Sequence, residues 1–78
     1  MIRPYFVCYT VRFSGPSHDY TVHSVVHSEV LAIDAPISTL GLRTLENELE
    51  LALARRGCPS VPEGAYIHSV LVTNLVPL

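Results

Sequence analysis

Hydrophobic and polar positions alternate along the first part of the chain. Residues 5–14 carry an apolar or aromatic side chain at every second position: Tyr5, Val7, Tyr9, Val11 and Phe13. Residues 20–33 also alternate, after the turn-forming sequence of residues 15–19, GPSHD. A period of two, with β-branched and aromatic residues, is typical of strands. The pattern therefore predicts a β-hairpin with a five-residue loop. Because the second run is long for a strand, we expect a bend or bulge near His27.

The periodicity changes after residue 34. Apolar residues then recur at helical spacing and form one stripe: Leu42, Leu45, Leu49, Ala52 and Leu53. Ser38 or Thr39 is suited to cap the start of this helix, and Gly57 is suited to end it. Leu51 lies off the stripe, beside Glu48 and Arg55, so we expect it to be exposed in a monomer. Residues 65–76 are almost continuously apolar and predict a third strand.

The order of elements predicts a small α+β fold. Residues 1–78 form one domain of β-β-α-β order. A right-handed crossover through the helix lays the third strand parallel to the second. The vacant place with short connections is then beside the first strand, which gives sheet order 2-1-3. The helix covers one face of this sheet, and the other face and both edges stay uncovered.

Length and composition point to self-association and exclude some classes. A chain of 78 residues, 49% hydrophobic and with mean hydropathy +0.35, buries only ~60% of its unfolded surface when it folds alone. We therefore expect a homo-oligomer. All five basic residues are arginine and the net charge is −2. Nucleic acid is not expected as a partner, because binding it requires a dense basic patch.

The sequence indicates a cytoplasmic protein. It has no 18-residue apolar run, so a membrane-spanning helix is not expected. Arg12 interrupts the N-terminal apolar run, which does not match a signal peptide. Cys8 and Cys58 could meet across a core, and the sequence leaves open whether they pair; reduced cysteines are common in cytosolic proteins.

Neither a metal site nor a catalytic site is expected. In a regular strand His23 and His27 would share a face but stand ~13 Å apart, at ~3.3 Å per residue, too far to bind one zinc ion. The sequence has no nucleophile elbow, phosphate loop or dinucleotide fingerprint. Glu46, Glu48 and Glu50 indicate a solvated helix surface rather than a catalytic pair. We therefore predict a protein that is not an enzyme and needs no cofactor.

Ligand binding on the uncovered sheet face is the remaining chemical hypothesis. If Val22, Val26 and Val30 point inward, that face carries a polar set that could bind phosphate: Thr10, Arg12, His23, His27 and His68, with Asn74 nearby. The planar guanidinium of arginine binds phosphate in bidentate fashion. The same residues could be ordinary exposed positions or a protein interface, and Leu51, Glu48 and Arg55 form a second candidate interface. A register shift of one residue would turn His23 and His27 inward.

Several segments match one group of known sequences. They are YFVCYTV from Tyr5, PISTLGLRTLENEL from Pro36, and SVLVTNLVPL from Ser69. Together they resemble a group of very small phage and prophage proteins in the first strand, the helix entry, the helix stripe and the last strand. Gly41 departs from that group, which has an acidic capping residue there. Residues 18–30 also depart, so a ligand site in that region of the group cannot be transferred.

The resemblance implies a counter-defence role, in the host cytosol if a phage encodes the protein. Some small phage proteins of this build resemble anti-CRISPR inhibitors, and others resemble oligomeric sponges that sequester signalling nucleotides. The leading hypothesis is therefore a non-enzymatic homo-oligomeric sponge for a small phosphorylated ligand. One alternative is a protein inhibitor of a host defence complex, with Glu46, Glu48 and Glu50 as an acidic epitope. Another is a structural accessory protein that only self-associates.

Overall fold

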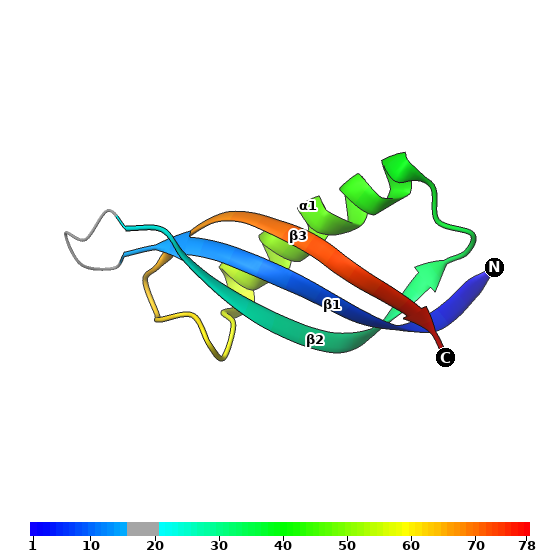
Figure 1. Ribbon diagram of the computed structural model, residues 1–78, viewed down its shortest axis with the longest axis horizontal. Helices are drawn as coiled ribbons and strands as arrows, with labels where there is room; N and C mark the ends of the chain where they lie inside the picture. The colour runs from blue at the N-terminus through cyan, green and yellow to red at the C-terminus, as the bar shows by residue number, and fades with distance from the viewer. Residues whose placement is uncertain (16–20) are drawn as a thin grey trace.

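The protein forms a three-stranded sheet with one helix across it. The computed structural model describes residues 1–15 and 21–78. Its elements are β1 (Ile2–Ser14), β2 (His23–Asp34), α1 (Thr39–Arg56) and β3 (Tyr66–Pro77). The strand order is β2-β1-β3, and β1 is antiparallel to both neighbours, so β2 and β3 are parallel (Figure 1). This confirms the predicted α+β fold, element order and sheet order. The predicted hairpin loop lies, apart from Gly15, outside the described residues.

Helix α1 runs diagonally across one face of the sheet. Its N-terminal half lies beyond β3, and its C-terminal half crosses behind the other strands (Figure 1). Ser38 caps the start: its Oγ accepts a hydrogen bond from the Gly41 amide at 3.0 Å. Gly57 ends the helix with a φ of 79°, a conformation that favours glycine. Both predicted ends of the helix are confirmed.

The helix cap can be tested by one substitution. Replacing Ser38 by alanine leaves the amide of Gly41 without its side-chain acceptor. We expect Ser38→Ala to lower the free energy of unfolding by about 1 kcal/mol, the usual cost of losing such a cap. Ser60→Ala, at an exposed loop position, is the control and should change it by less than about 0.5 kcal/mol. Urea denaturation of both variants measures the difference, and equal losses would contradict the capping role.

The core lies between α1 and the covered face of the sheet, called here the helix face. Its buried side chains come from all four elements and the loop after α1: Val7, Tyr9, Val11, Phe13, Ile33, Leu49, Leu53, Cys58 and Val70. Leu49 and Leu53 are the buried part of the predicted stripe, and its other members are half-buried. Leu51 is 60% exposed, as predicted. None of the described helices has the length and hydropathy to cross a membrane.

The predicted face of β2 is wrong. Val26 and Val30 are 73% and 58% exposed, so they point away from the core. His27 pairs with Tyr9, and His23 pairs with Phe13. Paired residues of an antiparallel sheet share a face, so both histidines lie on the helix face. The histidines face the helix because they alternate with Leu31 and Ile33, the largest aliphatic side chains of β2. Those two side chains contribute to the core.

The bend expected near His27 is also absent. Strand β2 pairs with β1 in one continuous register from Ile2–Asp34 to Phe13–His23. The register shifts occur in the other strand pair, between β1 and β3. They lie between Cys8 and Tyr9 and between Arg12 and Phe13. The irregular edge of the sheet is therefore β3, and β2 is the regular edge.

Candidate functional site

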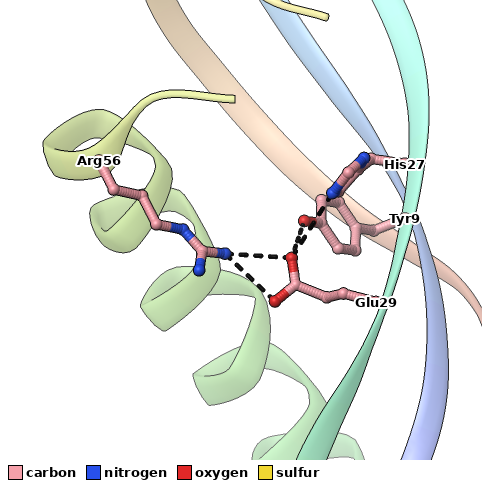
Figure 2. Close-up of polar contacts among 4 residues, drawn as sticks. All are labelled: Tyr9, His27, Glu29 and Arg56. Carbon is pink, nitrogen blue, oxygen red and sulfur yellow. Dashed lines mark hydrogen bonds and ion pairs between the residues drawn. The ribbon is translucent and has the colours of Figure 1, made fainter. Parts of the chain in front are cut away.

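Glu29 organises the main polar cluster of the helix face. The Tyr9 hydroxyl donates a hydrogen bond to Glu29 Oε2 at 2.6 Å. Arg56, in the last turn of α1, donates from one guanidinium nitrogen to both carboxylate oxygens, at 3.0 and 3.2 Å. His27 Nε2 lies 3.7 Å from Glu29 Oε2 (Figure 2). We call these four residues the carboxylate network, and it ties β2 and β1 to the C-terminal end of α1.

Burial and charge shift the protonation equilibria within this network. Partial burial favours the neutral form of Glu29, but the hydrogen bonds from Tyr9 and Arg56 outweigh it and lower its pKa. Burial, together with the hydrogen bond to the carboxylate, raises the pKa of Tyr9 well above its usual value. The contact with Glu29 also raises the pKa of Arg56. Near neutral pH the network therefore holds a carboxylate, a neutral phenol and a guanidinium.

This arrangement suits structure better than catalysis. A general base works best with a pKa near the operating pH, whereas the pKa of Glu29 is lowered and both its oxygens accept hydrogen bonds. A hollow of about 970 Å³ lies beside the network, between the end of α1, the following loop and β2. Its charged lining mixes Arg55 and Arg56 with Glu29 and Glu63. Neither sign of charge dominates, so the hollow does not select an anionic ligand.

The opposite side of the sheet, called here the open face, is uncovered by other described segments. It carries large apolar side chains that are 39–73% exposed: Phe6, Val26, Val30, Leu71 and Val76. The strand registers place them in two rows across the sheet. Phe6 lies between Val30 and Val76, and Thr10 lies between Val26 and Leu71. The open face is therefore apolar along much of its length.

One end of the open face is polar. Arg12 lies between Ser24 and Ser69 in the strand registers. Within the part of the chain that the structure describes, the Arg12 side chain has no hydrogen bond or ion pair. Farther along β1, Ser14 Oγ and His68 Nε2 are hydrogen-bonded at 2.7 Å. An arginine, hydroxyl groups and a histidine thus lie together at the end of β1 that leads to residues 15–22.

The structure divides the predicted ligand residues between two faces. Arg12, Thr10 and His68 lie on the open face, as expected. His23 and His27 lie on the helix face, where the His23 ring packs against Phe13 at 5.6 Å between centroids and His27 against Tyr9 at 5.5 Å. The five residues therefore do not form one site.

The second predicted set, Leu51, Glu48 and Arg55, lies exposed on α1. Nearby, Glu46 is not part of a free acidic epitope. Its Oε2 accepts a hydrogen bond from the Val72 amide of β3 at 2.7 Å. The acidic surface proposed for a protein inhibitor is therefore reduced by one engaged side chain.

Sequence reasoning missed the roles of Tyr9, Glu29 and Arg56. One signal was present: Glu29 is the only acidic residue in an alternation that also holds Leu31 and Ile33. A charged residue on a buried strand face needs a partner of opposite charge. Arg56 is 27 positions away, so the sequence alone does not name it as that partner.

Other chemistry could come from metal ligands or from the two thiols. Among residues 1–15 and 21–78, no cluster of three or more His, Cys, Asp and Glu side chains could hold a metal ion. Cys8 and Cys58 are both free thiols. Comparisons with protein families, with curated proteins and with solved structures give no match to this chain. The resemblance to small phage proteins therefore stays a prediction.

Proposed function

We propose that this protein is a non-enzymatic binding protein that self-associates and sequesters a small phosphorylated ligand, with signalling nucleotides as the ligand class. A protein that sequesters a signalling nucleotide would act as a sponge in counter-defence by a phage. The resemblance to small phage proteins supports this role. The observation that carries the proposal is the open face, which is apolar along much of its length and has Arg12 at its polar end.

The exposed apolar side chains support association with a second copy. Burying a half-exposed aliphatic or aromatic side chain gains about 1 kcal/mol, roughly half the value for full burial. The five large side chains of the open face, taken from two copies, then contribute about 10 kcal/mol. Association costs roughly 4–15 kcal/mol. Packing of two open faces therefore offsets a cost in the lower part of that range and is consistent with a reversible, concentration-dependent complex. Sedimentation velocity would detect such a complex as a rise in mass with concentration.

The polar end supports a phosphorylated ligand. Arg12 has no partner among the described residues, and serine side chains flank it on both neighbouring strands. Guanidinium and hydroxyl groups together provide the donors that phosphate oxygens accept. At the margin of two packed open faces, Arg12, Thr10 and His68 would line a site that no single copy completes.

The ligand can be identified by thermal stability. We expect one member of a panel of linear and cyclic nucleotides to raise the melting temperature. At 100 times its Kd it would add about 2.7 kcal/mol, or roughly 10–20 °C for a domain of this size. Arg12→Gln should abolish the shift. Arg43→Gln, which removes an arginine from the exposed side of α1, is the control and should keep it.

Other outcomes distinguish the alternative functions. An oligomer that no nucleotide stabilises overturns the sponge and favours a self-associating accessory protein. A monomer at all concentrations, with no nucleotide shift, overturns both. It would favour a protein inhibitor that uses the exposed α1 surface around Leu51, Glu48 and Arg55.

A further inference from the structure

The two edges of the sheet differ in how they are protected. At β3, two register shifts interrupt the pairing with β1. The Glu46 carboxylate occupies the Val72 amide, and Pro77 has no amide hydrogen to donate. Bulges, proline, charged side chains and covering segments are the devices by which proteins protect sheet edges from other strands. The edge at β3 uses several of them.

The edge at β2 uses none of these devices over residues 24–33. The strand has a continuous register, no proline and no lysine, and Glu29 is its only charged residue before Asp34. Among the described residues, no hydrogen bond from another segment reaches the backbone of residues 24–33 on the side away from β1. Arg56 contacts the Glu29 side chain, which lies on the helix face rather than at the backbone edge. A regular strand with free amides and carbonyls is a template for another strand.

The occupant that best fits this edge is β2 of a second copy. In antiparallel pairing about a twofold axis, opposite residues share a face, so the axis lies midway between the strands, at one residue that pairs with its own copy. An axis at Ser28 pairs Ser28 with its own copy and residues 23–27 with residues 33–29 of the second copy. It places His27 opposite Glu29 on the helix face and Val26 opposite Val30 on the open face. Each side chain thus meets a compatible partner.

Neighbouring registers are less compatible. An axis at Glu29 would place two carboxylates directly opposite each other, and an axis at His27 would pair the two imidazoles and leave Glu29 opposite Val25. Like charges at directly opposite positions destabilise a strand pair. Among these three registers, charge complementarity therefore favours Ser28 as the centre.

We propose that two copies join through antiparallel β2–β2 pairing centred on Ser28, which gives one six-stranded sheet. Both helices then lie on the same side, and the two open faces form one continuous surface. This inference rests on the self-association proposed above and adds to it a second contact, through the edge strand β2. The backbone hydrogen bonds along β2 stabilise this dimer, and its continuous open face stays available for packing against another copy.

A charge placed at the centre of β2 tests this pairing. In Ser28→Lys two ammonium groups would face each other across the twofold axis. Asn74→Lys is the matched control, because Ser28 and Asn74 are both exposed, both pair with Cys8 and both lie on the open face. They differ in edge, since Ser28 lies in β2 and Asn74 in β3. We expect Ser28→Lys to weaken self-association at least tenfold by sedimentation velocity, and Asn74→Lys to weaken it much less.

Opposite charges at position 28 provide the second part of this test. Mixing Ser28→Lys with Ser28→Glu should restore a mixed dimer in native mass spectrometry, which also shows that both variants are folded. Equal weakening by Ser28→Lys and Asn74→Lys, without a mixed dimer, would overturn β2 pairing but leave association through the open face intact. A wild-type chain that stays monomeric would overturn the pairing and the proposed self-association together. Unchanged association in both lysine variants would overturn the pairing alone.

Discussion

Replacing Leu53 by alanine is expected to lower the free energy of unfolding by about 3 kcal/mol, whereas Leu51→Ala should lower it by less than about 0.5 kcal/mol. The two leucines lie two positions apart on α1, but Leu53 is 2% exposed and Leu51 is 60% exposed. Truncating Leu53 removes buried methyl groups and leaves a cavity between the helix and the sheet. Truncating Leu51 removes contacts mostly with water.

Thermal and urea denaturation, at concentrations low enough to keep the chain monomeric, measure the two effects. The loss for Leu53→Ala corresponds to a fall in melting temperature of roughly 12–24 °C in a domain of this size. The urea midpoint should fall while the slope stays constant. Equal losses in the two variants would contradict the position of α1 on the sheet. A selective effect of Leu51→Ala on self-association would instead support the exposed α1 surface as an interface.

The helix and the sheet order were predictable because each rests on local or topological rules. The leucine spacing, Ser38 before the helix and Gly57 after it are read from neighbouring positions, and the structure confirms them. The position of β3 follows from the short hairpin and the handedness of the crossover, which together leave one vacant place beside β1. These features do not depend on contacts between distant side chains.

The face of β2 was not predictable by the same rules. One alternation carries Val22, Val26 and Val30, and the other carries Val25, Leu31 and Ile33 together with Glu29. Counting apolar residues does not separate them, and Glu29 argues against the correct one. The observed register is stable because Tyr9 and Arg56 donate hydrogen bonds to the Glu29 carboxylate. These hydrogen bonds join distant residues and form only in the folded chain.

The same error divided the predicted ligand site. A one-residue register change moves every side chain of a strand to the other face. His23 and His27 were therefore both predicted on the open face, whereas both lie on the helix face. Arg12 and Thr10 kept their place because β1 has five apolar or aromatic residues on one alternation and its face is unambiguous. The face of a strand residue is therefore predictable only where the alternation of its own strand clearly specifies which face is buried.

The hydrogen bond from Tyr9 to Glu29 is the second contact with a large expected effect. Tyr9→Phe removes a bond from a fully buried phenol to a carboxylate. Hydrogen bonds to charged groups contribute about 1.5–3 kcal/mol, so we expect a loss of about 2 kcal/mol near neutral pH. Glu29→Gln removes the charge from the same pair. If the two residues act together, the double variant should lose less than the sum of the single losses by about 1–2 kcal/mol.

The pH dependence of stability separates this hydrogen bond from simple packing. The pKa of Tyr9 is raised in the folded state, so the stability it contributes is complete below about pH 10, the pKa of an unfolded tyrosine. It is lost as the pH rises above that value, by up to about 1.4 kcal/mol per pH unit. The pKa of Glu29 is lowered, so its contribution is present above about pH 4.3 and is lost as the pH falls.

Urea denaturation from pH 3 to pH 11 tests both limits of this pH range. Tyr9→Phe should flatten the alkaline limit, because phenylalanine has no proton to lose, and Glu29→Gln should flatten the acid limit. Tyr66→Phe is the control for the alkaline limit, since Tyr66 is 68% exposed and outside the network. An alkaline limit that Tyr9→Phe leaves unchanged would mean that Tyr9 ionises as freely in the folded chain as in the unfolded chain. The phenol would then not be held by Glu29, and the network would link only β2 to α1, through Glu29 and Arg56.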